Sequence, residues 1–353
     1  MTTRYGTDRD QVEALLAEWG EPRYRSDQIW DALYRSATPL EGASSLPRAL
    51  RVRLDDALPL ALTEVAQATS ADRLTTKWLW AAGDDGAQVE TVLMRSARRA
   101  SVCVSSQAGC AMGCTFCATG QAGFERHLES GEIVEQVLRA AHGSPQRVTN
   151  VVYMGMGEPL ANYDEVWASV ERLHTDMGIS ARRITVSTVG VVPGMRRLAT
   201  ESLPVTLAVS LHAADDELRS SLVPLDRRYP IAEVLDAAAE VAGNRGRRVT
   251  FEYACIAGVN DAPRQIEALG RLLAAWPGVG GAHVNLIPLN PTRDYAGRAS
   301  DRRRLRDLAD RLTAHGVHAT VRRTRGVDID AACGQLRGRM MPRGQAPSTT
   351  LGA

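Results

Sequence analysis

From residue 100 onward the chain alternates strand-like and helical segments, and this alternation restricts the possible folds more than any other feature. The strand-like runs cover residues 100–106, 148–154, 183–188, 205–211, 248–256, 282–289 and 317–323. Helical runs, with apolar residues three and four positions apart, cover residues 130–141, 163–176, 230–242, 263–276 and 300–316. Strands that alternate with helices in this way predict βα units, and therefore a parallel sheet that is either open or closed into a barrel.

The chain before residue 98 has a different pattern. Residues 1–70 contain three amphipathic segments, at 10–20, 26–37 and 45–58, which predict a small helical domain. Two strand-like runs then flank Gly-Asp-Asp-Gly at 83–86, a sequence typical of a β-hairpin. We therefore expect a helical accessory domain over 1–70, a hairpin linker over 71–97 and a main α/β domain over 98–340. The polar end of the chain, 341–353, is expected to be disordered.

The composition is that of an ordinary globular protein. Of 353 residues, 44% are apolar and 24% are charged, and the net charge of +1 means that any basic surface must be a local patch. The first residues lack the apolar core of a secretory signal, and no apolar run reaches membrane-spanning length. We therefore expect a cytoplasmic protein that does not enter a membrane, in which clustered cysteines serve metal or redox chemistry.

Unusual polar residues follow the predicted strands. In a parallel βα fold the functional residues gather at the carboxyl ends of the strands. Five strand ends carry such residues, which are Cys110, the Gly-Met-Gly-Glu-Pro segment at 155–159, Ser187, the Ser210–Leu211–His212 segment and Asn290. We expect these residues to surround one site.

Three of the six cysteines, Cys110, Cys114 and Cys117, lie in one short loop with the spacing C-x3-C-x2-C. Three thiolates can hold three irons of a [4Fe–4S] cube and leave the fourth iron open. The alternatives are a zinc site with a distant fourth ligand, or unconnected core cysteines. Zinc loops favour C-x2-C pairs, and six cysteines would rarely bunch in this way by chance.

This loop, with Phe116 before its last cysteine, resembles the signature of the radical S-adenosylmethionine (radical SAM) superfamily. The resemblance implies that the open iron binds SAM, and that the reduced cluster cleaves SAM to release a radical. The Gly-Met-Gly-Glu-Pro segment is similar to the superfamily motif that contacts the SAM amino group, with Gly157 allowing close backbone approach and Glu158 offering a carboxylate.

The remaining cysteines indicate which family within the superfamily the chain resembles. Cys103 precedes the cysteine loop, Cys333 lies far downstream in "DIDAACGQL", and we interpret Cys255 as a small buried residue. Together with "YMGMGEP", "SLHA" and "NLIPLNP", these segments resemble the RlmN/Cfr family of radical SAM RNA methyltransferases, and "YRSDQIWDALY" is similar to the N-terminal RNA-binding domain of the RlmN branch. The resemblance implies a partial (βα)6 barrel with this accessory domain.

The resemblance also implies a mechanism. Carbon C2 of adenine is not nucleophilic, so in this family a first SAM methylates a cysteine, which Cys333 matches, and a second SAM generates the radical. Cys103 matches the cysteine that resolves the RNA–protein adduct through a transient disulfide, and Glu90 matches the general base. One [4Fe–4S] cluster per chain and two SAM molecules per turnover follow from this mechanism.

Other family positions can be matched one by one. The SAM contacts match Gly157, Glu158, Ser187, Ser210, Leu211, His212 and Asn290, and Met154 matches a methionine near the transferred methyl. Two positions depart from the family pattern. Val189 stands where a serine is usual, and Leu289 stands where an aromatic residue is common.

The expected partners are RNA and an electron donor. The family resemblance implies 23S rRNA as substrate, with tRNA next to the anticodon as a second candidate, and a donor such as flavodoxin or ferredoxin. We also expect a monomer. Basic residues around Cys333, in "VRRTRG" and "QLRGRMMPRG", are candidates for phosphate contact. The alternatives left open are a C8-directed, Cfr-like methyltransferase and a non-enzymatic iron–sulfur or zinc RNA-binding protein.

Overall fold

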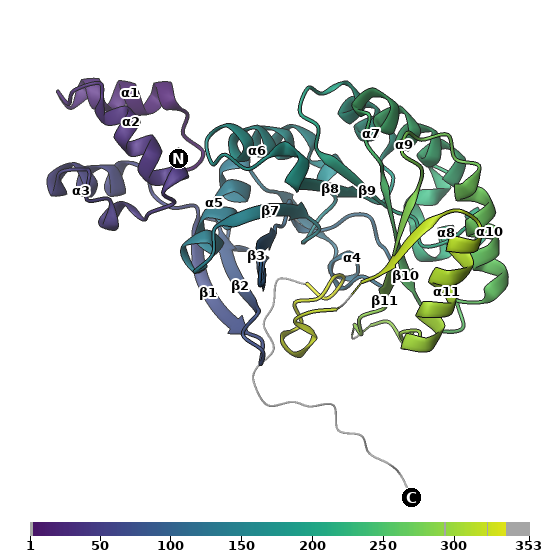
Figure 1. Ribbon diagram of the computed structural model, residues 1–353. Coiled ribbons are helices and arrows are strands. Elements are labelled where there is room, and N and C mark those ends of the chain that lie inside the picture. Colours follow the sequence, from purple (N-terminus) through teal and green to yellow (C-terminus); the bar gives the residue numbers. More distant parts are fainter. Residues whose placement is uncertain (1–2, 293, 323, 337–353) are drawn as a thin grey trace, which may run out of the picture.

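The fold is described from a computed structural model, which covers residues 3–292, 294–322 and 324–336. Its centre is a twisted sheet in which a series of parallel strands forms an incomplete barrel (Figure 1). The parallel strands are β4 (Arg99–Cys103), β7 (Val148–Tyr153), β8 (Ile184–Thr188), β9 (Thr206–Ser210), β10 (Thr250–Cys255), β11 (His283–Pro288) and β12 (His318–Val321), hydrogen-bonded in this order. The predicted partial (βα)6 barrel is thus confirmed, with β12 added at its edge.

Helices cover the outer face of these strands (Figure 1). They are α5 (Ser130–His142), α6 (Tyr163–Thr175), α7 (Val192–Thr200), α8 (Asp216–Leu222), α9 (Ile231–Arg245), α10 (Pro263–Ala274) and α11 (Arg302–Ala314). Their apolar sides and the outer faces of the strands bury a continuous core that includes Val137, Val170, Val186, Val209 and Leu308. Since the core lies between helices and strands, the inside of the barrel is free to hold polar groups.

Short elements join the barrel and surround its carboxyl end. The 3-10 turns are η2 (Leu40–Gly42), η3 (Pro159–Ala161), η4 (Ala181–Arg183), η5 (Pro224–Arg227) and η6 (Val327–Ile329). Between β4 and α5, the strands β5 (Gln107–Gly109) and β6 (Phe124–His127) pair with each other, with the short helix α4 (Ala118–Ala122) between them. These pieces hold the cysteine loop. No helix in the described ranges is long and apolar enough to span a membrane.

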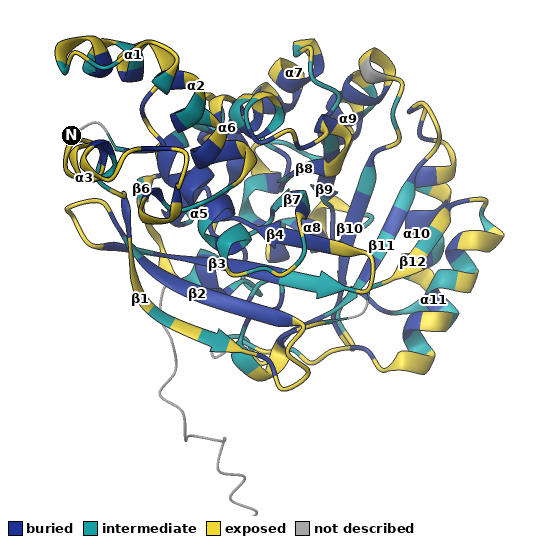
Figure 2. Ribbon diagram, turned by 60° about the vertical axis from the view of Figure 1, so that its left-hand side comes forward, coloured by how far each residue is buried: buried dark blue, intermediate teal, exposed yellow. Residues whose placement is uncertain are grey.

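An antiparallel extension continues the barrel sheet beyond β4. The predicted hairpin is present as β2 (Thr75–Ala82) and β3 (Ala87–Ser96), but β3 also pairs with β4, and β1 (Leu62–Thr69) pairs with β2. The expectation that residues up to 70 are helical is therefore wrong for β1, and the hairpin is part of the main sheet rather than a separate connector. Almost every residue of β2 is buried (Figure 2), which fits the apolar run from Trp78 to Ala82.

The N-terminal helices form a separate layer at one end of the molecule (Figure 1). They are α1 (Arg9–Glu18), α2 (Arg25–Trp30), which continues into the π-helical turn η1 (Asp31–Arg35), and α3 (Arg48–Ala57). They are anchored to the barrel through α5, where Glu135 accepts hydrogen bonds from the backbone N–H groups of Ala61 and Leu62 at 2.8 and 3.1 Å. The domain boundaries themselves stay a prediction, and the tail 341–353 lies outside the described residues.

A close backbone contact at Gly131 gives a test of this anchoring. A Cβ atom at Gly131 of α5 would lie 2.6 Å from the backbone nitrogen of Gly6. We expect Gly131→Ala to lower the free energy of unfolding by about 1–3 kcal/mol, because neither backbone can give way. Urea unfolding measures the change, and proteolysis within residues 3–60 should become faster.

The matched control is Gly243→Ala in α9, where an added Cβ would meet nothing within 4 Å. It should be neutral or stabilise the protein by up to about 1 kcal/mol, since alanine is the better helix former. Equal stability of the two variants would contradict the tight contact between α5 and the N-terminal layer.

Candidate active site

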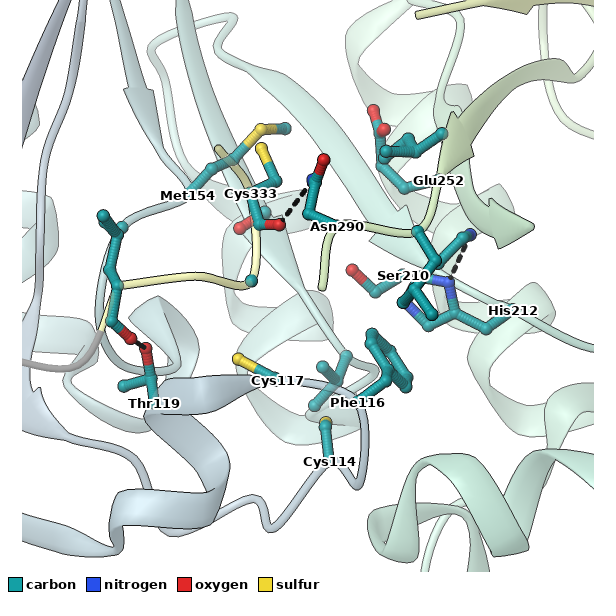
Figure 3. Close-up of a pocket in the computed structure, with 18 of the residues that line it drawn as sticks. Cys114, Phe116, Cys117, Thr119, Met154, Ser210, His212, Glu252, Asn290 and Cys333 are labelled. Carbon is teal, nitrogen blue, oxygen red and sulfur yellow. Dashed lines mark hydrogen bonds between the residues drawn. The ribbon is translucent and has the colours of Figure 1, made fainter. Parts of the chain in front are cut away.

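Two cavities meet inside the barrel, and Cys333 lies where they meet. Including space open to solvent, their empty volumes are about 970 and 1300 Å³. The first lies against the cysteine loop and the carboxyl ends of β7 to β11, whereas the second extends along β4 and β7. Both are lined by Met154, Ile287, Asn290, Arg322, Cys333 and Leu336. Figure 3 shows Cys333 beside Met154, on the opposite side of the first cavity from Cys114 and Cys117.

The cysteine loop is shaped by its flanking glycines and by contacts with distant segments. Gly109 has a φ of 71°, and a Cβ there would collide with the carbonyl of Gly123. Without a side chain at that position, the N–H of Cys110 can donate to the same carbonyl at 2.7 Å. The N–H of Thr115 donates to the carbonyl of Leu222 at 3.0 Å. The loop is therefore fixed by backbone bonds and its thiols are left for other contacts.

The three thiols of the loop fit an iron–sulfur cluster by chemistry and environment. Cys114 is buried and Cys110 and Cys117 are partly buried. Burial raises the pKa of Cys110 to about 12 and that of Cys114 well above its ordinary value, and neighbouring thiols add to both shifts. Within the described ranges no three His, Cys, Asp or Glu side chains converge on a single metal ion. A cube differs from such a site, because each thiolate binds its own iron.

Glu158 lies in the wall of the first cavity and is rigidly held. Its side chain accepts the N–H groups of Val189 at 2.9 Å and Leu160 at 3.1 Å. Burial raises the pKa of Glu158 to about 7, an effect that these hydrogen bonds oppose. Gly157, with a φ of 97°, has no room for a Cβ because the side chain of Gln107 lies 2.6 Å from that position. The Gly-Met-Gly-Glu-Pro segment therefore presents a carboxylate and a close-packed backbone to the cavity.

Most of the other strand-end residues also line this cavity. Ser187, Ser210, His212 and Asn290 do so, as the sequence predicted, but Leu211 packs into the main core and does not. The ring of His212 lies edge-on to Phe116, and its Nδ1 accepts the N–H of Ala254 at 3.0 Å. Burial lowers the pKa of His212 to about 3, so the ring is neutral at physiological pH.

The two departures from the family pattern lie in the same place. Val189 and Leu289 pack in one apolar cluster with Cys114, Phe116 and Cys117. The backbone of Val189 is used on both sides, since its N–H donates to Glu158 and its carbonyl accepts from Arg219 at 2.6 Å. These contacts use only the backbone of Val189, and its side chain adds an apolar group beside the cysteine loop.

The segment that carries Cys333 is held across the open barrel by hydrogen bonds from α4 and from Asn290, which follows β11. The amide of Asn290 donates to the carbonyl of Cys333 at 2.8 Å, as Figure 3 shows. The N–H of Ala118 donates to the carbonyl of Gly334 at 2.8 Å, and the hydroxyl of Thr119 donates to the carbonyl of Leu336 at 2.5 Å. Cys333 is thereby fixed above the cysteine loop.

Cys103 lines the second cavity, close to Cys333. It packs with Ala331 and Leu336, on either side of Cys333, and both thiols are free. Burial and, to a smaller extent, the Cys333 thiol raise the pKa of Cys103 to about 12, and the guanidinium of Arg322 opposes both effects. Arg322 belongs to the basic "VRRTRG" segment, where the sequence indicated phosphate contact, but it lines both cavities and interacts electrostatically with both thiols.

Glu90 is completely buried and does not line either cavity. Its carboxylate lies 2.9 Å from the ammonium group of Lys77, which is also buried. The same ammonium donates to the carbonyl of Asp330 at 3.1 Å. Lys77 thus links the proposed base to the segment of Cys333. Lys77 was not among the residues predicted from the sequence, although a lysine inside the apolar run "TTKWLWAA" was a signal of a buried charge.

The Lys77–Glu90 pair gives a stability test. Replacing Lys77 by Met leaves the Glu90 carboxylate buried without its cation, and we expect a loss of about 3–5 kcal/mol in the free energy of unfolding by urea. Adding Glu90→Gln to Lys77→Met removes the charge as well and should recover part of that loss. A double variant less stable than Lys77→Met alone would contradict a buried ion pair.

Comparisons with known proteins agree with this site. Residues 104–272 match the model of the radical SAM superfamily. A protein from Parafrankia sp. (strain EAN1pec), described as a probable dual-specificity RNA methyltransferase RlmN, is 50% identical over 93% of this chain and 89% of its own length. A protein of the same description from Salinispora tropica is 51% identical over 95% and 93%.

The fold matches a solved structure over nearly the whole chain. The crystal structure of a radical SAM methyltransferase from Sphaerobacter thermophilus superimposes with a TM-score of 0.90 at 47% identity, covering 96% of this chain and all of that one. Together with the sequence relatives, this likeness shows that the chain is a radical SAM enzyme and belongs to the RlmN family of RNA methyltransferases.

Proposed function

We propose that this enzyme methylates C2 of an adenosine in 23S rRNA, and of the adenosine next to the anticodon in tRNA, through a methylated cysteine and a transient disulfide. The observation that carries the proposal is the position of Cys333 at the junction of two cavities. One cavity has the cysteine loop and Glu158, which suit the cluster and SAM. The other has Cys103 and is the natural place for the substrate base.

The cofactors supply the reactivity and the chain supplies the positions. When bound, a [4Fe–4S] cluster held by Cys110, Cys114 and Cys117, together with SAM, supplies a methyl group and a radical that abstracts hydrogen. Glu158, Ser187, Ser210, His212 and Asn290 would orient SAM from the cavity wall, and Gly157 would allow close approach of its backbone. Asn290 has a second task, since its amide holds the Cys333 carbonyl.

The two thiols and Glu90 would complete the reaction. The Cys333 sulfur carries the methyl group, which loses one hydrogen atom and becomes bonded, through that carbon, to C2 of the base. The resulting radical must also lose one electron, which the bound cluster would accept. Glu90 takes the ring proton, and the Cys103 sulfur then attacks the Cys333 sulfur. The bond between Cys333 and the carbon breaks, the carbon keeps the electron pair and takes up a proton to become the methyl group, and a disulfide remains that a reductant must reopen. Burial of Glu90 beside Lys77 means that its carboxylate reaches the base only after a local rearrangement.

The location, oligomeric state and electron donor of the enzyme are part of the same proposal. A cytoplasmic monomer that receives electrons from a flavodoxin- or ferredoxin-like protein fits the expected chemistry.

The non-enzymatic alternative is excluded by the relatives, which are described as methyltransferases. C8 as the target carbon is the remaining alternative, and C2 is favoured because the relatives are of the RlmN type.

Single cysteine variants test the roles of the two thiols. Cys333→Ala should abolish methylation of an unmodified 23S rRNA transcript and retain SAM cleavage, because only the methyl acceptor is lost. Cys103→Ala should accumulate a protein–RNA adduct visible as a band of retarded mobility. Cys255→Ala is the matched control, since Cys255 is a fully buried core thiol outside both cavities, and it should retain methylation. Methylation by Cys333→Ala would contradict the mechanism.

Iron analysis tests the three-cysteine loop independently of RNA. Anaerobically reconstituted protein should contain about four irons per chain, as a complete cluster requires. Replacing Cys114 by Ala should lower the iron content and the absorbance of the cluster, whereas Cys103→Ala and Cys333→Ala should leave both unchanged. Loss of iron in the Cys333 variant would instead make Cys333 a cluster ligand.

A further inference from the structure

The second cavity runs along the inside of the barrel, away from the cysteine loop. Arg99, Ser101 and Cys103 alternate along β4 and all three line it, as do Asn150 and Thr185 near the starts of β7 and β8. From Arg99 to Cys103 the strand rises about 13 Å. The cavity therefore connects the two thiols with the amino ends of the strands, the end opposite to the cluster loop.

An open depression continues the cavity to the surface at that end. Its empty volume, including space open to solvent, is about 710 Å³. It shares Ser96, Arg99 and Asn150 with the second cavity, and its other lining residues are Arg98, Thr149 and Arg183. Arg98 comes from the turn between β3 and β4, Arg99 is the first residue of β4, and Arg183 belongs to η4 just before β8. We call Arg98, Arg99 and Arg183 the basic mouth.

The charge of the basic mouth is not balanced by carboxylates. Neither the second cavity nor the depression is lined by an Asp or Glu. All three arginines are exposed, and no ion pair found in the described ranges involves them. Some other surface arginines are compensated, since Arg304 and Arg311 of α11 both pair with Asp307. An uncompensated group of guanidinium groups around an opening attracts a polyanion.

We propose that the basic mouth is where the RNA substrate enters, and that its guanidinium groups bind the phosphates flanking the target adenosine. This inference rests on the proposed function. One nucleotide extruded from a loop would pass the mouth and extend its base along β4 to the thiols, while its neighbours stay outside. The side chains of Ser101, Asn150 and Thr185 offer hydrogen bonds to a ribose or base without adding charge.

A docking site for an acidic electron donor would also be basic, but the location argues against it. Electrons are needed at the cysteine loop, which lies at the carboxyl ends of the strands. The basic mouth lies at their amino ends, and the barrel interior with Cys103 and Cys333 separates the two. Phosphates of a substrate that must reach those thiols suit this position better.

The test uses the reconstituted enzyme, an unmodified 23S rRNA transcript and a series of salt concentrations. The triple variant Arg98→Ala, Arg99→Ala, Arg183→Ala should weaken RNA binding on the order of tenfold. It should also lower the slope of the logarithm of the RNA association constant against the logarithm of the salt concentration by about 2, because each phosphate that is no longer neutralised accounts for about 0.7. The matched control removes Arg302, Arg303 and Arg306, which are exposed on α11, and should change neither quantity appreciably.

A second measurement distinguishes binding of RNA at the basic mouth from docking of an electron donor there. Without RNA, the basic-mouth variant should cleave SAM at the wild-type rate with either dithionite or reduced flavodoxin. Unchanged RNA affinity and salt slope in this variant would overturn the inference, and so would a selective loss of flavodoxin-driven cleavage with intact RNA binding. Wild-type protein that binds RNA through the mouth without methylating it would contradict the proposed function and leave the RNA entry site standing.

Discussion

The site depends on the path of the chain after β12, which returns across the open barrel and brings Cys333 over the cysteine loop. Four hydrogen bonds define this path, from Asn290 to Cys333, from Ala118 to Gly334, from Thr119 to Leu336 and from Lys77 to Asp330. Their donors come from β2, from α4 and from Asn290 just after β11. A displacement of any of these elements would move Cys333 relative to both cavities, so the antiparallel extension helps to position Cys333.

A barrel with a reactive interior cannot obtain its stability there. In a filled barrel, layers of branched apolar side chains pack the centre. Here the inward positions hold groups such as Ser101, Asn150 and Asn285, and the amide of Asn285 donates to Glu252 at 2.9 Å. The apolar core lies instead between the outer faces of the strands and the helices. This arrangement leaves two cavities inside the barrel, and Cys103 and Cys333 both line the second one.

The sequence predicts the residues that local pattern controls and misses those that depend on pairing across the fold. Alternating strands and helices predict the barrel, and strand ends predict Glu158, Ser187 and Asn290. Leu211 lies between two cavity residues and yet turns into the core, since neighbouring side chains of an extended segment face opposite ways. β1 is too polar to be identified without its partner β2. The ion pair of Lys77 with Glu90 and the joint packing of Val189 with Leu289 arise only after distant segments meet.

The most direct test of the proposed mechanism is mass spectrometry of nucleosides from ribosomal and transfer RNA of a strain that lacks this gene. The mechanism predicts that 2-methyladenosine disappears from 23S rRNA, and returns when the wild-type gene is restored but not when Cys333 is replaced by Ala. Unchanged 2-methyladenosine, or loss of 8-methyladenosine in its place, would contradict it.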